Sequence, residues 1–347
     1  MSKNVLITGG AGFIAHHIID RILRTTDWNI VTLDRLDFSG NLNRLADMMQ
    51  DHAPEVRRRV RPVFHDLKAE ISPLTAGMIG DINYVLHLAA GSHVDRSIEY
   101  PMEFVMDNVV GTVNLLQWAR TLPNLERFIN FSTDEVFGPA PTGVLYKEYD
   151  RYNSTNPYSA SKSTQESLAL AYFKTFKIPI TIVNITNMIG ETQNQEKYLP
   201  KVIRRIIHDE VVQIDTTKEG QIGSRRYIHT EDVATGLWKI IESIISSEEK
   251  KSEDYILPEK FHISGSQEIS NLELVEIVST FMRKQAKIIL APSPRPGYDQ
   301  QYQLSSDKLR VLGWKEKLSI TTRIEQVVKW TLENPIWLEI DHVQARK

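Results

Sequence analysis

The stretch that decides the fold is Val5-Leu6-Ile7-Thr8-Gly9-Gly10-Ala11-Gly12-Phe13-Ile14-Ala15, near the start of a 347-residue chain. Its first residues predict a short buried strand, and the amphipathic pattern that follows predicts a helix through about Leu23. Gly9 permits the tight turn between them, and Gly12 lets the backbone approach a pyrophosphate at the helix N-terminus. Ala15 replaces the usual third glycine and is small enough for close packing of helix on sheet. A glycine pattern alone is weak evidence, but its place between strand and helix predicts a dinucleotide site.

The ends of later strands supply polar groups for the same ligand. The strand Asn29–Leu33 ends in Asp34, whose carboxylate can accept hydrogen bonds from the adenosine ribose and repel a 2′-phosphate. Arg35 could attract that phosphate, so the residues favour NAD over NADP and leave both open. Asp66-Leu67 follows a third predicted strand, where Asp66 can reach the adenine amine. A fourth strand runs into Ala89-Ala90-Gly91, small residues that let a cofactor pass close to the backbone.

A second group of polar residues follows another predicted strand. The apolar run Arg127–Phe131 leads into Ser132-Thr133-Asp134-Glu135, and a helix through about Phe176 opens near Tyr158. Tyr158 and Lys162 are four residues apart, so they lie one turn apart on one helix face. The Lys162 ammonium is expected to stabilise the phenolate and lower the pKa of Tyr158.

Asp134 and Glu135 are adjacent, so within a strand their side chains would point to opposite faces. Both reach one substrate only if the chain leaves the strand there, as Gly138-Pro139 indicates. Alone, the Tyr-x-x-x-Lys pattern is typical of a surface helix, and an Asp-Glu pair is typical of a solvated turn. Together, behind a dinucleotide motif, they predict a site that removes a hydride and then runs acid–base chemistry beside the new carbonyl.

Composition narrows the class of protein. The hydrophobic content of 41% is ordinary, and a net charge of −3 argues against a nucleic-acid surface or a polybasic membrane anchor. No apolar segment approaches the length a bilayer needs, and the chain enters a strand too soon for a signal peptide. The absence of cysteine excludes disulfides and thiolate metal sites. We therefore expect a cytoplasmic enzyme with no bound metal, no nucleic-acid partner and no membrane association.

Strands and helices alternate as far as about residue 185, which predicts an α/β fold with a Rossmann-type, doubly wound parallel sheet. We expect residues 1–185 to form an NAD-binding domain that also carries the catalytic residues. Residues 186–347 are expected to form a smaller, mixed α/β substrate-binding lobe, with segments crossing back to the first domain. The elements expected there are helices near Tyr198–His208, Asn271–Arg283 and Ile320–Glu333 and a charged loop at Ser246–Asp254.

Several motifs together carry a resemblance to a known family. Thr8–Ile14, Leu33–Leu42 and His87–Ser97 resemble the extended short-chain dehydrogenases/reductases. Ser132–Gly138, Tyr158–Lys162 and Arg295-Pro296-Gly297-Tyr298-Asp299 make the chain similar to the nucleotide-sugar 4,6-dehydratases, most closely to the dTDP-glucose branch. The likeness runs from Asn4 to about Trp337. The Thr-Asp-Glu triplet discriminates best, because related epimerases generally lack the acidic pair.

The resemblance implies a reaction on a nucleotide-diphosphate (NDP) hexose, with tightly bound NAD across the first lobe. Tyr158, helped by Lys162 and Thr133, would take the proton from the sugar O4 while C4 gives a hydride to NAD. Glu135 would then remove the C5 proton, and Asp134 would protonate the departing C6 hydroxyl. Return of the hydride to C6 would give an NDP-4-keto-6-deoxyhexose and make the enzyme a hydro-lyase.

The resemblance also implies substrate ligands and a homodimer. The substrate-binding positions that match are His93, Asn187, Lys197, Arg225 and Arg295, although surface, turn-capping or core roles remain open for them. The dimer contact would use helices near Met102–Arg120 and Ser159–Phe176. Their apolar positions include Val105, Val109, Leu116, Leu168 and Tyr172.

The chain departs from the dTDP-glucose branch mainly around the substrate. Gly91 stands where that branch usually has glutamate, Asn184 where it has arginine, Arg226 where it has aspartate, and Met188-Ile189 where it has Asn-Tyr. The nucleotide (dTDP, UDP, GDP or CDP) and the hexose therefore stay open. An epimerase or a 5,6-dehydratase on the same scaffold is an alternative, and a non-catalytic NAD-binding protein is a third. The acidic pair argues against the epimerase, and the intact Thr133, Tyr158 and Lys162 argue against the non-catalytic protein.

Overall fold

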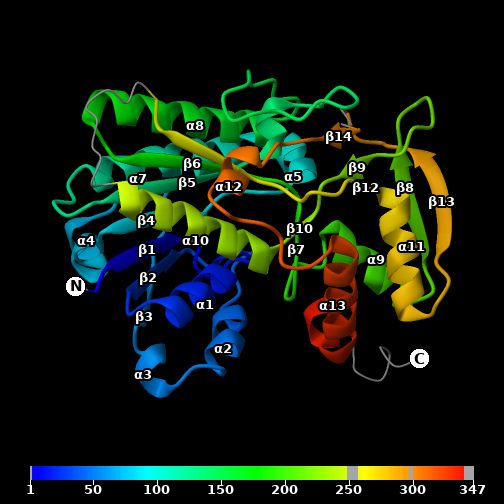
Figure 1. The fold of residues 1–347 in the computed structure, drawn as a ribbon, viewed down its shortest axis with the longest axis horizontal. Coiled ribbons are helices and arrows are strands. Elements are labelled where there is room, and N and C mark those ends of the chain that lie inside the picture. Colours follow the sequence, from blue (N-terminus) through cyan, green and yellow to red (C-terminus); the bar gives the residue numbers. More distant parts are fainter. Residues whose placement is uncertain (1, 248–256, 297–299, 340–347) are drawn as a thin grey trace.

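A seven-stranded parallel sheet forms the centre of the computed structural model, which describes residues 2–247, 257–296 and 300–339 (Figure 1). The strand order is β11-β6-β5-β4-β1-β2-β3. The bounds are β1 (Asn4–Thr8), β2 (Asn29–Asp34), β3 (Val60–Phe64), β4 (Tyr84–His87), β5 (Arg127–Thr133), β6 (Ile180–Ile185) and β11 (Glu259–Ile263). The order reverses between β1 and β4, and this switch point is where open α/β sheets bind ligands, at the carboxyl ends of the strands. The α/β, Rossmann-type fold class is confirmed.

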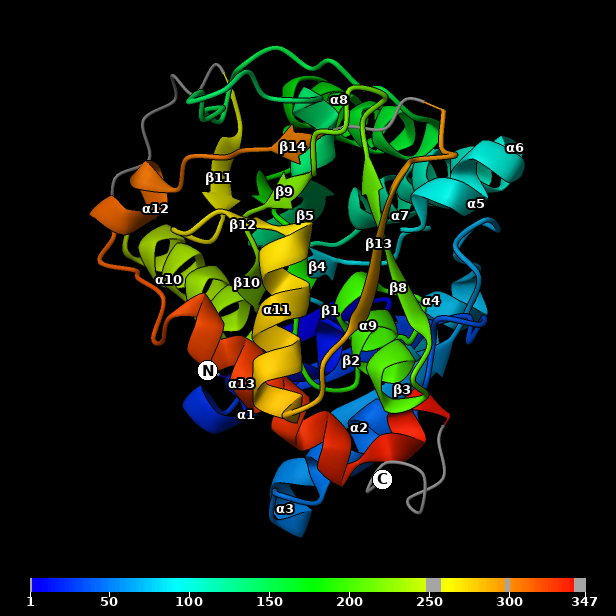
Figure 2. The ribbon, with the colours of Figure 1, turned by 90° about the vertical axis from the view of Figure 1, so that its right-hand side faces the viewer.

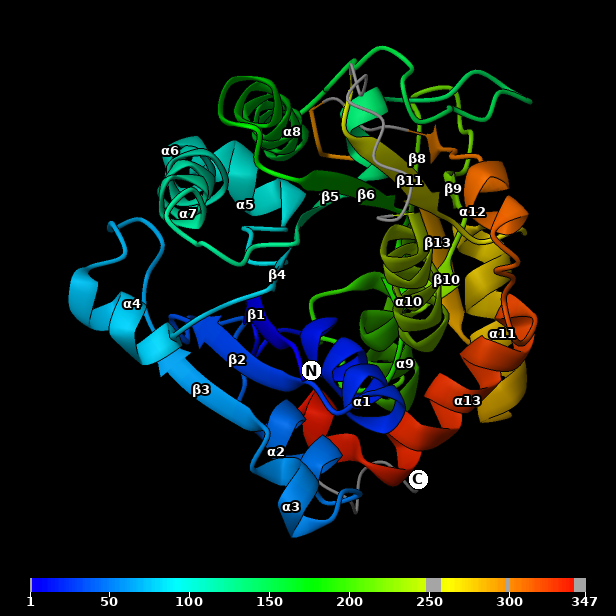
Figure 3. The ribbon, with the colours of Figure 1, turned by 60° about the vertical axis from the view of Figure 1, so that its left-hand side comes forward.

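Helices cover both faces of the sheet (Figure 3). α1 (Ala15–Thr25) and α10 (Thr230–Ser247) pack on one face, and α7 (Gly111–Ala119) and α8 (Pro157–Phe176) pack on the other. Alternation along β1 shows why both faces need cover, because Val5 and Ile7 enter one apolar core and Leu6 enters the other. The sheet is thus a rigid base, and the loops at its carboxyl edge are left to form a site.

The helix expected near Met102–Arg120 is broken into three pieces. α6 (Pro101–Phe104) is followed by a π-helical segment, η1 (Val105–Val110), and then by α7. The wider turn accompanies an inward Asn108, whose side-chain amide donates to the Gly91 carbonyl oxygen (3.1 Å) and whose oxygen accepts from the Gly91 N–H (2.7 Å). Asn108 also donates to the Ser161 hydroxyl (2.8 Å). The irregular segment therefore fixes the loop after β4, which spacing alone does not reveal.

The shorter elements of the first lobe lie mostly at its periphery. They are α2 (Asn43–Met49), α3 (Pro54–Arg57), α4 (Pro73–Ile79), α5 (Val94–Glu99) and the 3₁₀ turn η2 (Asp134–Phe137). η2 begins directly after β5, so the chain leaves the strand at Asp134 as expected.

A second lobe lies beside the carboxyl edge of the sheet in Figure 1 and faces the viewer in Figure 2. Its elements include α9 (Tyr198–Ile207), β8 (Val211–Thr216), α11 (Asn271–Met282), β13 (Lys287–Pro292), α13 (Ile320–Glu333) and η4 (Pro335–Leu338). Short strand pairs link it to the site: β7 (Met188–Ile189) with β10 (Ile228–His229), and β9 (Ser224–Arg225) between β12 (Ile269–Ser270) and β14 (Gln301–Tyr302). The lobe has its own apolar core, in which α9, α11 and α13 contribute Ile203, Leu274 and Ile324.

The predicted lobe boundary stays a proposal. We place it after residue 185 and include α10, β11 and α12 (Asp307–Val311) with the first lobe, because β11 pairs with β6 and both helices share a core with α1. Two predicted features lie partly outside the described residues: positions 248–254 of the charged loop and positions 297–299 of the Arg295 motif. In the part of the chain that the structure describes, no helix is both long and apolar enough to span a membrane.

Candidate active site

The glycine loop between β1 and α1 is tightly constrained. Gly9 has a φ of +69°, in the left-handed region that favours glycine, and a Cβ there would lie 3.0 Å from the backbone of Ala89. A Cβ on Gly12 would lie 2.8 Å from the Gly9 carbonyl oxygen, which accepts the Gly12 N–H at 2.9 Å. The loop thus presents bare backbone at the start of α1, as a dinucleotide pyrophosphate requires.

The adenosine end of the site carries carboxylates. Asp34, at the end of β2, accepts hydrogen bonds from the backbone N–H groups of Ala11 (2.9 Å) and Leu36 (2.8 Å), so its carboxylate is held in one orientation. Arg35 is bound by two other carboxylates, Asp37 (2.7 Å) and Asp107 (2.7 Å). Because those carboxylates neutralise Arg35, this end suits an unphosphorylated ribose better than a 2′-phosphate. The residues present therefore fit NAD.

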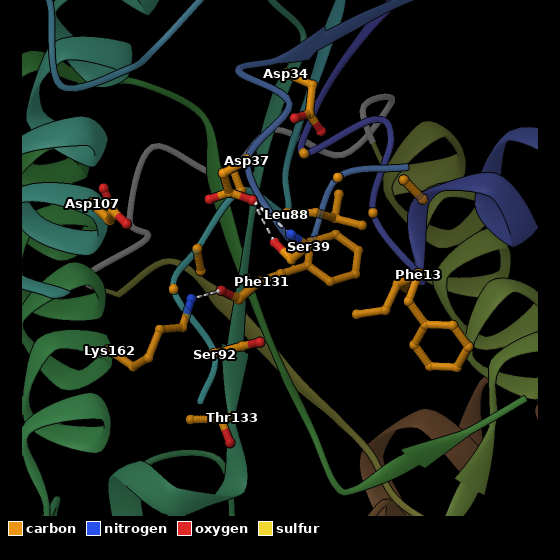
Figure 4. Close-up of a pocket in the computed structure, with 18 of the residues that line it drawn as sticks. Phe13, Asp34, Asp37, Ser39, Leu88, Ser92, Asp107, Phe131, Thr133 and Lys162 are labelled. Atoms are coloured by element: carbon orange, nitrogen blue, oxygen red, sulfur yellow. Dashed lines mark hydrogen bonds between the residues drawn. The ribbon is translucent and has the colours of Figure 1, made fainter. Parts of the chain in front are cut away.

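A cavity of about 340 Å³ joins this end to the catalytic strand end. Its lining includes all the predicted cofactor positions: Gly9, Gly12, Phe13, Ile14, Asp34, Asp66, Leu67, Ala89, Tyr158 and Lys162. Thr133, Asp134 and Glu135 line it as well. Figure 4 shows Asp34 toward one end of the pocket and Thr133 toward the other, with Lys162 reaching the backbone of Phe131 between them.

The acidic pair occupies the turn that follows β5. The Thr133 hydroxyl caps this turn by accepting the Glu135 N–H (3.3 Å), and it donates to the Asp134 carboxylate (3.0 Å). Burial, reinforced by the charge of Glu135, raises the pKa of Asp134 to about 7. Burial also raises the pKa of Glu135, whose carboxylate accepts the amide of Asn156 at 3.1 Å. Two neighbouring carboxyls whose pKa values are both raised by burial can act as an acid and a base in one reaction.

The expected effect of Lys162 on Tyr158 is wrong in this structure. Burial and the charge of Glu135 raise the pKa of Tyr158, although its hydroxyl shares a hydrogen bond with Thr133. Lys162 instead donates to the Phe131 carbonyl oxygen (2.7 Å) and to the Gln165 side chain. Burial lowers the pKa of Lys162 to about 7. Helical spacing places the two residues on one face, but the loss of hydration on burial dominates the pKa of the Tyr158 phenol.

Of the five predicted substrate residues, two line the cavity and three do not. Asn187 and Lys197 line the cavity, and the buried Asn187 Oδ1 has no hydrogen-bond partner among the described residues. His93 instead caps the start of α5 with its Nδ1, which accepts the Arg96 N–H at 3.5 Å. The other two, Arg225 and Arg295, are absent from the cavity lining.

Those two arginines nevertheless lie within electrostatic reach of the acids. The charges of both lower the pKa of Glu135, opposing the larger effect of burial. Arg225 donates to the Gln300 carbonyl oxygen (2.9 Å) and its guanidinium lies over the Tyr302 ring. Arg295 makes a two-point ion pair with Asp95 of α5 (2.6 and 3.0 Å), which joins the two lobes.

Sequence reasoning missed several residues of the site. Asn156 caps α8 and binds Glu135, and the Tyr302 hydroxyl lies 3.5 Å from the same carboxylate. Asn156-Pro157 before a helical pattern is a recognisable start signal, so Asn156 could have been found. Tyr302 could not, because it reaches the acids from a two-residue strand far along the chain.

The structure also accounts for two departures from the family pattern. A Cβ at Gly91 would lie 3.1 Å from the Phe104 ring, so a glutamate there would need the ring to shift by a few tenths of an ångström. Arg226 donates to the Ser266 carbonyl oxygen (2.6 Å) and to Gln303, so it ties β9 to a neighbouring loop. Across the described residues, no cluster of three or more His, Cys, Asp or Glu side chains could hold a metal ion.

Comparison with known proteins agrees with this geometry. A family model described as GDP-mannose 4,6 dehydratase matches residues 6–327. The dTDP-glucose 4,6-dehydratase 1 of Escherichia coli K12 is 32% identical over 98% of this chain and 95% of its own length. The crystal structure of the dTDP-glucose 4,6-dehydratase DesIV from Streptomyces venezuelae, with NAD and TYD bound, has a TM-score of 0.83 at 29% identity, covering 97% of this chain and 99% of that one.

The fold also extends to other activities. A UDP-glucuronic acid 4-epimerase from Bacillus cereus superimposes with a TM-score of 0.82 over 95% of this chain and 99% of its own, at 23% identity, which shows a common fold alone.

The glycine loop, the Asp34 carboxylate and the Tyr158–Lys162 helix define an extended short-chain dehydrogenase/reductase. Within that class, the full-length match and the acidic pair after β5 are decisive. The chain belongs to the nucleotide-sugar 4,6-dehydratase family.

Proposed function

We propose that this protein is an NAD-dependent NDP-hexose 4,6-dehydratase that uses Thr133, Asp134, Glu135, Tyr158 and Lys162 as its catalytic residues. The observation that carries the proposal is the pair of carboxyls at the end of β5, Asp134 buried and Glu135 half-buried, in one cavity with the tyrosine and the lysine. A simple dehydrogenase or epimerase needs no acid–base pair beside the tyrosine, whereas the loss of water needs both an acid and a base.

The cofactor is bound by the glycine loop and by the carboxylates at the adenosine end. Gly9, Gly12, Phe13 and Ile14 would hold the pyrophosphate at the start of α1. Asp34 would accept the ribose hydroxyls, Asp66 would accept the adenine amine, and Leu67 and Ala89 would pack against the cofactor. NAD supplies the hydride acceptor for C4 and the hydride donor for C6.

The first proton transfer belongs to Tyr158. The hydroxyl of Thr133 shares a hydrogen bond with the phenol, and together they would hold the sugar O4 while Tyr158 takes its proton. Lys162 gains and loses a proton near neutral pH, because burial lowers its pKa to about 7. Its ammonium lies on the same face of α8 as Tyr158 and would help to hold the cofactor there.

Elimination belongs to the acidic pair. The C4 ketone acidifies the C5 hydrogen, and Glu135, held by Asn156, would remove it as the general base. Asp134 retains its proton up to about pH 7 and would deliver it to the C6 hydroxyl as water leaves. Correctly placed acids and bases each contribute roughly 10²- to 10⁴-fold to a rate, so both carboxyls matter.

The substrate is an NDP-hexose whose nucleotide stays open. The E. coli relative is named for dTDP-glucose and the family model for GDP-mannose, so the family spans more than one nucleotide. Asn187, Lys197, Arg225 and Arg295 would contact the diphosphate and nucleotide, and His93 would lie close to the sugar. Asn187 and Lys197 are supported by their place in the cavity lining, and Arg225 and Arg295 by their electrostatic effect on Glu135.

Incubation of the enzyme and NAD with a panel of NDP-hexoses tests this proposal. A 4,6-dehydratase gives a product lighter by one water that absorbs near-ultraviolet light in alkali. An epimer keeps the parent mass, a 5,6-dehydratase stops at an alkene, and a non-catalytic protein leaves every substrate unchanged.

We further infer a cytoplasmic homodimer that pairs the α6–α7 region and α8 of two chains. Met102, Val105 and Met106 are exposed apolar residues of this region, which supports a covered face. Leu116 and Tyr172 are buried within the monomer and so belong to its core. Light scattering that shows only monomer at working concentrations would rule the dimer out.

A further inference from the structure

A buried ion pair lies next to the catalytic turn, and neither of its residues lines the cavity. Glu166 of α8 and Lys260 of β11 are each 1% exposed, and their charged atoms lie 2.7 Å apart. Asn184 of β6 is completely buried beside them, and Tyr152 closes the group. We call Tyr152, Glu166, Asn184 and Lys260 the buried clamp.

Glu166 is the hub of the clamp. Its Oε2 accepts hydrogen bonds from Lys260 Nζ (2.7 Å) and from the Tyr152 hydroxyl (2.6 Å). Its Oε1 accepts one from Asn184 Nδ2 (2.7 Å). Three donors satisfy the hydrogen-bonding capacity of the Glu166 carboxylate, and together they leave its side chain little freedom to move.

The clamp contacts the catalytic turn at both ends. At the start of the turn, Asn184 Nδ2 donates a second hydrogen bond to the Thr133 carbonyl oxygen (2.9 Å). At its end, Lys260 Nζ lies 4.7 Å from the centre of the Phe137 ring, a cation–π contact. Asp134 and Glu135 lie between these two points of attachment.

The clamp also faces Lys162. Glu166 lies four residues further along α8, one turn away, and its charge raises the pKa of Lys162 against the larger lowering by burial. Glu166 is the charged group that supports the Lys162 ammonium most strongly, since Lys162's own hydrogen bonds go to a carbonyl and an amide oxygen.

We propose that the buried clamp is a positioning device for the 4,6-dehydratase reaction: Asn184 and Lys260, held by Glu166, fix the turn that carries Thr133, Asp134 and Glu135. This inference rests on the proposed function for its kinetic consequence. None of the four residues lines the cavity, so they act through the turn and through Lys162.

The residue types of the buried clamp support a role in positioning the turn rather than a role in stability alone. A buried ion pair is usually no more stable than well-packed apolar residues of the same volume, so stability alone does not explain it. Asn184 occupies a position where the dTDP-glucose branch usually has arginine, and in this chain the positive charge next to Glu166 comes from Lys260 on the adjacent strand.

The first test separates Asn184 from the ion pair. Asn184→Leu removes both hydrogen bonds while keeping the number and branching of the side-chain heavy atoms, and it leaves Glu166 and Lys260 paired. Asn130→Leu is the matched control, because Asn130 is equally buried on the neighbouring β5 and its side chain has no hydrogen-bond partner within the described part of the chain. Both variants are compared with wild type by amide hydrogen exchange over residues 132–138 and by steady-state kinetics.

We expect faster exchange over residues 132–138 in Asn184→Leu only. We also expect its kcat to fall by about tenfold to a hundredfold at unchanged KM, the effect of misplacing groups by about 1 Å. A merely structural role would lower the thermal midpoint of both variants and spare kcat. Equal exchange and equal kcat in the two variants would overturn the proposal.

The second test removes the charges together. Glu166→Gln/Lys260→Met keeps a packed, neutral pair, so the enzyme should stay folded, while the alkaline limb of its kcat profile should move to lower pH as Lys162 loses its supporting charge. Full kcat with an unchanged profile would contradict the inference. If wild type turns over no NDP-hexose, the proposed function fails, and the exchange data on Asn184→Leu still decide whether the clamp holds the turn.

Discussion

Replacing Asp134 by asparagine should stabilise the protein in a pH-dependent way while abolishing the acid step. Asp134 is 3% exposed, and burial raises its pKa from the ordinary 3.8 to about 7. In the unfolded chain the carboxyl loses its proton first, so the free energy of unfolding falls as the pH rises from about 4 to about 7. Asparagine does not titrate, so the free energy of unfolding of the variant does not fall for this reason as the pH rises.

The size of the effect follows from the shift. A rise from 3.8 to about 7 corresponds to roughly 4 kcal/mol at about 1.36 kcal/mol per pKa unit. Urea unfolding of Asp134→Asn and wild type across this range should show a difference in unfolding free energy that grows by about this amount and then levels off above about pH 7. Asp47→Asn, which removes an exposed carboxyl from α2, controls for the loss of one negative charge.

The titration of Asp134 should also appear in the pH dependence of kcat. Wild-type kcat should fall as the pH rises above about 7, because the acid loses its proton, and Asp134→Asn should be nearly inactive at every pH. A difference in unfolding free energy that stays constant with pH would refute the view that Asp134 is a buried acid held in its protonated form.

Four further outcomes follow from the site. Glu135→Gln should lose about 10²- to 10⁴-fold in kcat yet still oxidise C4, so stopped-flow absorbance should show reduced nicotinamide accumulating, whereas rapid turnover would contradict its role. Tyr158→Phe should block the oxidation of C4 itself, so no reduced nicotinamide should accumulate. Gly9→Ala places a Cβ 3.0 Å from the Ala89 backbone at a φ of +69°, so it should cost about 1–2 kcal/mol in unfolding and weaken NAD binding in calorimetry. Asp34→Asn should weaken NAD binding by about tenfold, and unchanged affinity would remove Asp34 from the ribose site.

The sequence was sufficient for the parts of the site that depend on local pattern. The strand–glycine–helix order predicted the cofactor loop, and Gly138-Pro139 predicted that the chain leaves β5 at Asp134. The periodicity of the long helix placed Tyr158 and Lys162 on one face. Each of these follows from residues close together in the chain.

The parts that depend on long-range contact or desolvation could not be predicted. Lys260 meets Glu166 only because β11 joins the sheet beside β6, after an excursion through the second lobe. The pKa of Tyr158 moves in the opposite direction from that expected, because burial outweighs the neighbouring lysine. The π-helical segment forms around Asn108, whose partner Gly91 is remote in sequence.

The central claim is that one hydride leaves C4 and returns within the same active site to C6. The most direct measurement uses an NDP-hexose deuterated at C4 and locates the label in the product by NMR and mass spectrometry. We predict that the label is found at C6 of the 4-keto-6-deoxy product and that no reduced nicotinamide is released. Label lost to solvent, or reduced nicotinamide released once per turnover, would contradict it.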